Sequence, residues 1–303
     1  MQKTDLNVSP YYDDFDPADN FHRVLFRPGF AVQARELTTL QSIMQNQIER
    51  HGRHFFKEGS MVIPGQISYT NSYYAVKLQS TFNSAAIAGY LSSFVGSIVT
   101  GGISGITARV VGYSDATTTD APTLYVKYLT TATNSASATG TTGASVAGST
   151  YDFVNGESLA ADKVISSFNA GANSVTLLTS GATSSGSSAA IQEGVYFVRG
   201  QFVRVPEQRI ILDKYTNTPS YRVGLTVAEE LITPESDTTL LDNAAGSSNV
   251  NAKGAHRLKV SLTLDKLELG STDDENFIEL LRLKNGVIEK LVDKRHRIRT
   301  LLD

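Results

Sequence analysis

Apolar residues recur with helical spacing near the amino end of the chain. No proline or glycine falls between Val32 and Arg50, and the apolar positions there are separated by three or four residues. This spacing predicts an amphipathic helix with one buried face, formed by Leu37, Leu40, Met44 and Ile48. Gly52 is expected to end the helix. Leu37, Leu40, Met44 and Gln47 also fit the a and d positions of a coiled coil, but over only about two heptads, so ordinary core packing is favoured.

The segment before this helix combines bends with aromatic side chains. Ser9-Pro10 and Asp16-Pro17 predict bends, because proline fixes its own backbone and restricts the residue before it. The rings around these bends supply more apolar area than a solvated tail would keep. They are Tyr11, Tyr12, Phe15, Phe21 and Phe26. We therefore interpret residues 1–65 as a docking segment and helix, in which these rings and the helix stripe form a partner interface.

Residues 66–113 and 191–292 carry the patterns of a β-rich body. Two tight hairpins are predicted there. The first turns at Arg199-Gly200-Gln201, and the second turns at Asn285-Gly286, between the apolar runs 277–283 and 287–292. In the second, the spacing of Leu280, Leu281, Lys284 and Ile288 would also suit a helix, but the hairpin is favoured. The last segment, residues 293–303, is predicted to be a short helix. Its apolar stripe still runs at the end of the sequence, so the chain is expected to be a piece of something longer or to finish its last helix against a partner.

Between these parts, residues 114–190 differ in composition from the rest of the chain. Thr, Ser, Ala and Gly dominate, and short β-type runs are separated by Gly, Asn and Ser clusters. This pattern predicts a separately inserted small β-domain, while low-complexity disorder competes as an interpretation for residues 131–150. The predicted fold class is therefore mainly β with α elements: an N-terminal amphipathic helix, a β-rich body with a Ser/Thr/Gly-rich insert, and a short C-terminal helix.

Composition and charge narrow the function classes. The 303 residues include no cysteine, which excludes disulfides and thiolate sites, and the formal net charge of −3 gives no field that would attract nucleic acid. No apolar run approaches the roughly 18 residues that span a bilayer, and the amino end lacks the pattern of a signal peptide. We expect neither nucleic acid nor membrane as a partner, and assembly in a cytoplasm.

Candidate chemical sites each have a simpler explanation. An acidic cluster at Asp13, Asp14, Asp16 and Asp19 could ligate Ca²⁺, but it lacks the glycine and the final glutamate of a calcium loop, so solvation or capping is favoured. His51 and His54 have a spacing usable for a metal, but no third ligand is placed. The basic cluster at Lys294, Arg295, Arg297 and Arg299 is more typical of a solvated face. Since phosphate-loop, dinucleotide and nucleophile-elbow motifs are absent from the sequence, we expect no enzyme activity, cofactor or metal.

Three long blocks carry a family resemblance. They are FRPGFAVQARELTTLQSIMQNQIERHGRHFFKEGSMVIPG, IILDKYTNTPSYRVGLTVAEELITPESDTTLLDNAAGSSN, and GAHRLKVSLTL followed by DENFIELLRLKNGVIEKL. They resemble a domain of structural proteins in tailed phages, especially phages of cyanobacteria, over nearly everything outside residues 114–190. The resemblance implies a virion protein of the tail fibre or baseplate region that docks through its N-terminal part. It also implies other tail or baseplate proteins as partners and a homo-oligomer, for which a trimer is plausible.

A second hypothesis assigns the chain to host recognition, as a carbohydrate-binding or carbohydrate-degrading module. In that interpretation the insert presents loops to a cell-surface glycan. Sugar sites need aromatic faces. The insert offers Tyr125, Tyr128, Tyr151, Phe153 and Phe168 and no tryptophan. The shortage of rings makes this the weaker hypothesis.

Overall fold

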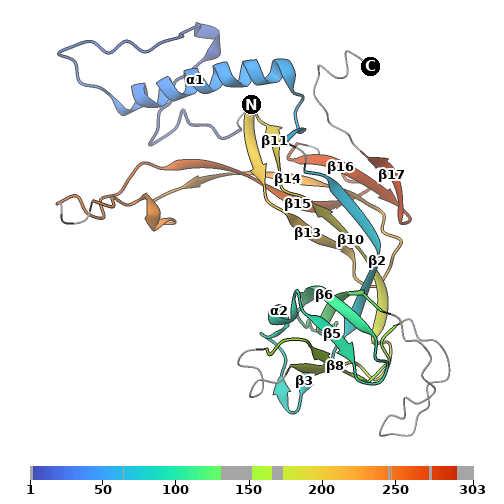
Figure 1. The fold of residues 1–303 in the computed structure, drawn as a ribbon. Coiled ribbons are helices and arrows are strands. Elements are labelled where there is room, and N and C mark those ends of the chain that lie inside the picture. Colours follow the sequence, from blue (N-terminus) through green and yellow to red (C-terminus); the bar gives the residue numbers. More distant parts are fainter. Residues whose placement is uncertain are drawn as a thin grey trace.

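The computed structural model describes residues 3–63, 65–130, 152–165, 173–244, 246, 248–272 and 275–291. Over these residues the chain is mainly β with two α-helices, which confirms the predicted class at that level. The predicted C-terminal helix at 293–303, its basic cluster and the 131–150 segment lie outside the described residues. Figure 1 shows three parts: an N-terminal region containing α1 (Ala34–Phe55), a β body beneath it, and a smaller lobe at the far end.

Strands of three sheets build the body. In spatial order, the first sheet contains β1 (Ser60–Ile63), β11 (Gly194–Val198) and β12 (Gln201–Val205). The second contains β15 (Arg257–Glu268), β14 (Tyr221–Ile232), β16 (Phe277–Lys284) and β17 (Val287–Leu291). The third begins in the body with β13 (Gln208–Asp213), β10 (Thr183–Ile191) and β2 (Ile67–Lys77). Their apolar faces enclose one core, in which Tyr196, Val205 and Leu283 are buried.

The third sheet continues into the smaller lobe. Its further strands, in spatial order, are β7 (Thr123–Tyr128), β6 (Thr107–Ser114), β5 (Ile98–Gly101), β8 (Ser158–Ala161) and β9 (Ser174–Thr176). The lobe also holds β3 (Thr81–Phe82), β4 (Ala85–Ala86) and α2 (Leu91–Phe94). Its core is separate from that of the body and includes the fully buried Phe94, Leu124 and Leu159. The sequence predicts short strands here at 106–113, 124–129, 163–168 and 174–178. The first, second and fourth correspond to β6, β7 and β9, whereas the described part of the third, residues 163–165, is not a strand.

Two long paired strands, β2 and β10, join the lobe to the body (Figure 1). The lobe's core draws residues from Val76 to Ala182, so the lobe begins well before the predicted insert boundary at Ser114. Composition misplaced this boundary because the segment 78–113 has ordinary apolar content, yet its strands pair with β7 and β8 across the Ser/Thr-rich stretch. The Ser/Thr/Gly-rich composition belongs to part of the lobe rather than to all of it.

Polar contacts brace the junction between the two parts. The Lys77 ammonium lies 4.0 Å from the centre of the Tyr215 ring, and the Tyr215 hydroxyl donates to Asp120 at 2.5 Å. Lys214 donates to the other oxygen of Asp120 at 3.2 Å. Beside them, the rings of Tyr73 and Tyr125 pack 5.3 Å apart between the two cores. Side chains from both parts therefore meet in one cluster at the junction, where Tyr215 packs against Tyr73 and Tyr125.

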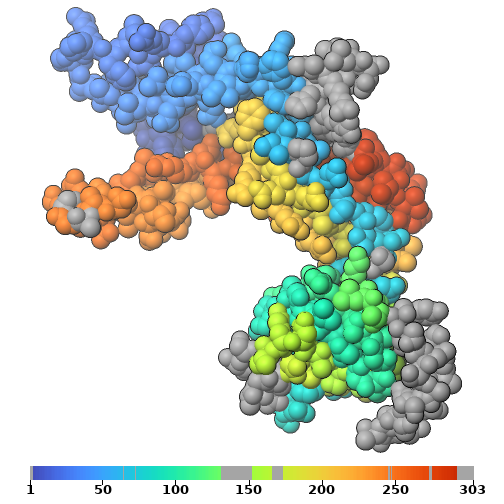
Figure 2. Space-filling model, viewed as in Figure 1, coloured from blue at the N-terminus to red at the C-terminus, as the bar shows by residue number. Residues whose placement is uncertain are grey.

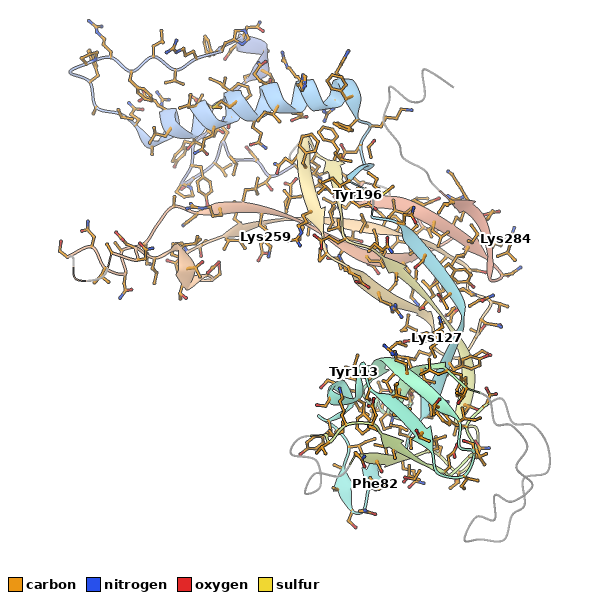
Figure 3. All side chains as sticks on the ribbon, in the orientation of Figure 1. Phe82, Tyr113, Lys127, Tyr196, Lys259 and Lys284 are labelled. Atoms are coloured by element: carbon orange, nitrogen blue, oxygen red, sulfur yellow. The ribbon has the colours of Figure 1, made fainter. Side chains whose placement is uncertain are left out.

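Both predicted hairpins are present. Arg199 and Gly200 have φ angles of 52° and 81° between β11 and β12, and Asn285 and Gly286 have φ angles of 50° and 77° between β16 and β17. Positive φ at both central residues is the geometry of a type I′ turn, which matches the twist of paired strands. Within the body, the buried Tyr196 on β11 (labelled in Figure 3) donates from its hydroxyl to the Gly65 carbonyl at 2.8 Å.

An arm projects from the body between β14 and β15. These strands pair along their whole lengths, and the chain between them, residues 233–256, continues outward on the same side as the N-terminal region (Figure 1). A single bridge between Leu241 and Lys253 closes the arm, and the Lys253 ammonium pairs with Glu235 at 2.6 Å. The Tyr11 hydroxyl contacts His256 Nδ1 at 2.6 Å, which ties the N-terminal segment to the base of the arm.

Candidate docking surface

Helix α1 carries the predicted docking surface, and it is longer than predicted. The Gln33 N–H donates to the Glu36 carboxylate at 3.0 Å, which satisfies a free donor at the helix start. The helix continues through Gly52 to Phe55, so the prediction that Gly52 ends it is wrong. Gly52 is buried, and a Cβ atom there would lie 2.6 Å from the Phe197 ring. This glycine serves the close approach of the helix to the body.

An aromatic cluster holds the carboxyl end of α1. Phe197 is fully buried, and its ring centroid lies 5.6 Å from that of Phe56 and 5.3 Å from that of Phe202. At the tip of the same hairpin, a Cβ atom on Gly200 would lie 2.5 Å from the side chain of Glu49. Gly52 on the helix and Gly200 on the hairpin therefore allow α1 to pack closely on the β11–β12 hairpin.

The N-terminal segment lies against the amino half of the helix through its acidic residues. Asp13 is buried and accepts hydrogen bonds from the hydroxyls of Ser42 and Thr39. Asp14 pairs with Arg35 at 3.2 Å. Asp16 accepts from the Ala18 N–H at 2.8 Å and so caps the short 3-10 helix η1 (Pro17–Asp19). Three of the four acids, Asp13, Asp14 and Asp16, thus have structural partners. For Asp16, this partner is a helix cap, as the favoured interpretation of the cluster expected.

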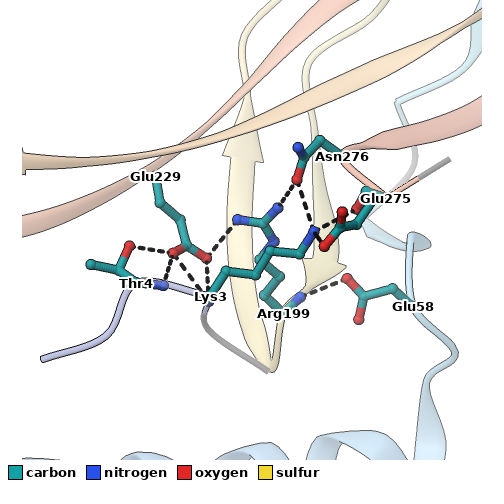
Figure 4. Close-up of polar contacts among 7 residues, drawn as sticks. All are labelled: Lys3, Thr4, Glu58, Arg199, Glu229, Glu275 and Asn276. Atoms are coloured by element: carbon teal, nitrogen blue, oxygen red, sulfur yellow. Dashed lines mark hydrogen bonds and ion pairs between the residues drawn. The ribbon is translucent and has the colours of Figure 1, made fainter. Parts of the chain in front are cut away.

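A buried polar network fixes the start of the chain to the body (Figure 4). Glu229 of β14 accepts from the backbone N–H and the hydroxyl of Thr4 at 2.7 and 2.5 Å, and from the Lys3 N–H at 3.1 Å. The Arg199 guanidinium donates to Glu229 at 2.6 Å and to Asn276 at 2.5 Å, and the side chains of Arg199 and Glu229 are only 8% and 5% exposed. The network joins the chain start, the hairpin tip and the base of the arm.

The same network shifts the titration of Glu229. Burial alone would raise the pKa of this carboxyl, but the donors from Thr4, Lys3 and Arg199 lower the pKa from 4.5 to about 2. A carboxyl whose pKa falls on folding adds stability above its unfolded pKa, and this stability is lost as the pH falls toward the folded pKa.

We expect a pH-dependent stability difference between the native chain and a Glu229→Gln variant. The native chain should be more stable by up to about 3 kcal/mol above pH ~5, and the difference should shrink progressively between about pH 4.5 and 2. Chemical denaturation at a series of pH values measures it. A difference that stays constant through this interval would show that the Glu229 carboxylate is not held ionised by the network.

Most of the predicted interface residues are exposed. Of the nine, six lie on the surface of the described chain: Tyr12, Phe21, Phe26, Leu37, Met44 and Ile48. Phe15, Leu40 and Tyr11 are half-buried, and Tyr11 is occupied by His256. The prediction that the helix stripe packs in the core of its own chain is wrong, since Met44 is 60% exposed and Ile48 is 54% exposed. The helix instead turns Ile43, Ser42 and Gly52 toward the N-terminal segment and the hairpin.

A loop missed by the sequence reasoning extends this surface. Residues 21–32 connect η1 to α1, and we call them loop 21–32. Besides the predicted Phe21 and Phe26, the loop exposes Leu25 at 77%, Phe30 at 66% and Val32 at 55%. The Arg27 guanidinium lies 4.9 Å from the centre of the Phe30 ring. Figure 2 shows the N-terminal region, in blue, standing out from the body. The sequence signal was available, because apolar residues flank the Arg27-Pro28-Gly29 turn.

The other candidate sites do not form a metal-binding group in the described part of the chain. The rings of His51 and His54 pack against Phe55, with centroids 4.9 and 5.3 Å from it. Across the described ranges, no three His, Cys, Asp or Glu side chains are grouped in a way that could hold a metal ion. The described helices include none with the length and apolarity of a membrane span.

The aromatic residues that a glycan site would need are placed in or beside the lobe's core. Tyr125 and Phe153 are buried, and Tyr128 is half-buried with its hydroxyl accepting from the Phe153 N–H at 3.1 Å. Tyr151 and Phe168 lie outside the described residues. The three rings that are described thus serve packing, and none of them presents an open face of the kind that stacks on a sugar.

Comparison with known proteins gives one match. No curated protein and no solved structure matches the chain. The sequence profile of the family described as "Domain of unknown function (DUF4815)" matches residues 9–142 and 171–297. This match includes parts of the 114–190 segment that the resemblance had left out, namely 114–142 and 171–190. Since the profile spans most of the body, the lobe and the N-terminal region, the chain belongs to the DUF4815 family.

Proposed function

We propose that this chain is a structural component of a phage virion, which attaches a tail fibre or forms part of the tail or baseplate through its N-terminal region. One observation carries the proposal: the N-terminal region exposes a concentration of large apolar side chains on loop 21–32 and on α1. Large exposed apolar patches on a soluble chain are typical of protein–protein interfaces. The phage context comes from the sequence resemblance described above.

The way this surface is mounted supports a docking role. The Arg199 network fixes the chain start, and the Phe197 cluster fixes the carboxyl end of α1. An interface on a pre-organised support loses less conformational entropy on binding than a flexible tail would. The lobe lies at the opposite end of the molecule (Figure 1), where it leaves the N-terminal region free to contact neighbouring proteins.

Removing the rings of loop 21–32 should abolish incorporation into particles. In a triple variant with Phe21→Ser, Phe26→Ser and Phe30→Ser, we expect the copy number in purified virions to fall to roughly a tenth or less, because aromatic anchors dominate interface energies. The stability of the isolated chain should change little, since these side chains are exposed. Quantitative mass spectrometry of particles made with the variant as the sole copy measures the loss.

A double variant with Tyr113→Ser and Val164→Ser is the matched control. Both residues are exposed and apolar, but they lie in the lobe, far from α1 (Tyr113 is labelled in Figure 3). We expect this variant to incorporate at the native copy number. Normal incorporation of the triple loop variant would show that the N-terminal surface does not attach the chain.

A further inference from the structure

The exposed face of α1 forms one continuous stripe. Leu37, Gln41, Met44 and Ile48 follow one another at intervals of four, three and four residues, and all four side chains are exposed. Such a sequence of intervals keeps side chains in one line along a helix and is the spacing of a coiled-coil seam. The stripe stays open because α1 contacts its own chain through Ser42, Gly52 and other residues on the remaining faces.

Charge decides what kind of helix this stripe can accept. Residues 37–48, LTTLQSIMQNQI, contain no charged side chain. Of the charged residues that flank the stretch, Arg35 pairs with Asp14 and Arg53 pairs with Glu49. The Glu36 carboxylate accepts from the Gln33 N–H, and Arg50 lies off the stripe. A partner of opposite charge therefore gains nothing along the seam, whereas a second copy of the same helix meets no like-charge repulsion there.

The order of side chains along the stripe also favours one orientation of the partner helix. In a parallel, in-register pair, Leu37, Met44 and Ile48 each meet their own counterparts, and apolar area is buried against apolar area. Gln41 meets Gln41, and two amides can exchange hydrogen bonds across the seam. A single polar residue in such a seam fixes the register, because any shift places the amide against apolar side chains. A rotation axis that runs along the helices produces this parallel arrangement of identical elements.

We propose that the stripe Leu37, Gln41, Met44 and Ile48 binds the same stripe in a second copy of this chain, as a parallel and in-register helix pair or ring. The inference rests on the proposed function, since it assigns an occupant to one part of the docking surface. The two surfaces then have different partners: α1 joins copies of the chain to one another, and loop 21–32 meets a neighbouring virion protein.

Because the chain has no cysteine, single cysteine substitutions report the pairing directly. In the full-length protein, oxidation of a Gln41→Cys variant and of an Ile48→Cys variant should each convert more than roughly half of the chain to a disulfide dimer, since bonded cysteines need Cα atoms within about 7 Å. Positions 41 and 48 are about 10 Å apart along the helix, so an antiparallel pair could link only one of them. Arg50→Cys, exposed but off the stripe, should form no disulfide dimer under the same oxidation.

Solution mass provides the independent measurement. We expect the native chain to sediment as a multiple of 32.7 kDa, and Met44→Glu to weaken the association at least about tenfold by placing a charge in the seam. Val164→Glu, an equally exposed apolar site in the lobe, is the control and should associate like the native chain. Unchanged far-UV circular dichroism verifies that Met44→Glu is folded.

Two results would overturn the inference: a native chain that stays a 32.7 kDa monomer at roughly 100 µM, or disulfide formation at only one of the two seam positions. A monomeric chain whose incorporation still depends on loop 21–32 would leave the proposed function standing. Conversely, a chain that forms the helix pair but incorporates without its loop rings would contradict the proposed attachment and not the pairing.

Discussion

Replacing Arg199 by alanine is expected to lower the free energy of unfolding by about 3–5 kcal/mol. The guanidinium lies between Glu229 and Asn276 with 8% of its side chain exposed, and its removal leaves the Glu229 carboxylate buried beside neutral donors only. Breaking a buried ion pair from one side costs this much, because the remaining charge has lost its counterion without regaining water. Chemical denaturation followed by tyrosine fluorescence measures the change.

The same hairpin provides a matched control. Arg204 on β12 pairs with Glu193 at 2.7 Å, nearly the distance of the Arg199 pair, but its side chain is 72% exposed. Arg204→Ala should therefore cost less than about 1 kcal/mol. If the two variants lost equal stability, burial would not be the source of the strength of the Arg199 contact. Arg199→Ala should also free Lys3 and Thr4, which limited proteolysis at the amino end would detect.

Phe197→Ala is the second change with a large expected effect. The ring is fully buried between α1 and the rings of Phe56 and Phe202, so its loss creates a cavity at the seat of the helix. Truncation of a buried phenylalanine to alanine costs about 3–5 kcal/mol. We expect α1 to loosen with it, visible as faster amide hydrogen exchange in residues 45–55 than in the strands of the lobe.

A double-mutant cycle between Gly52 and Phe197 tests whether position 52 requires glycine because of its contact with the Phe197 ring. Alone, Gly52→Ala should lower stability by about 1–3 kcal/mol, since the new methyl group would overlap the Phe197 ring. In the Phe197→Ala background the obstacle is gone, and the same substitution should stabilise by up to about 1 kcal/mol, because alanine favours helix over glycine. If Gly52→Ala has the same effect in both backgrounds, the contact with Phe197 is not what requires glycine.

Features governed by nearby residues could be predicted from the sequence. The amphipathic helix and the two type I′ hairpins each depend on a few neighbouring positions, as Arg199-Gly200 and Asn285-Gly286 illustrate. The mainly β class followed from the alternation of apolar and polar residues. Gly52 was misread because a glycine near a helix end has two common causes, and only the position of Phe197, 145 residues away along the sequence, distinguishes them.

The candidate docking surface, too, could be predicted only in part from the sequence. The apolar character of Leu37, Met44 and Ile48 was evident from spacing, but the sequence could not say which of the helix faces its own chain would cover. The lobe boundary failed for a related reason: strands β5 and β6 pair with β8 and β7, and pairing across long stretches of chain leaves no local compositional mark. The Arg199 network likewise joins residues 3, 199, 229 and 276, which no spacing rule connects.

By itself, then, the amino-acid sequence determined the local conformations of this protein: one amphipathic helix, the turns, the strands and an aromatic segment before the helix. The tertiary structure decided which of those apolar residues are buried and which form a surface. The physical reason is that periodicity and turn chemistry act over a few residues, whereas burial depends on contacts between distant segments, here the seating of α1 on the β11–β12 hairpin. That seating leaves the helix stripe open and gives the N-terminal region its candidate role.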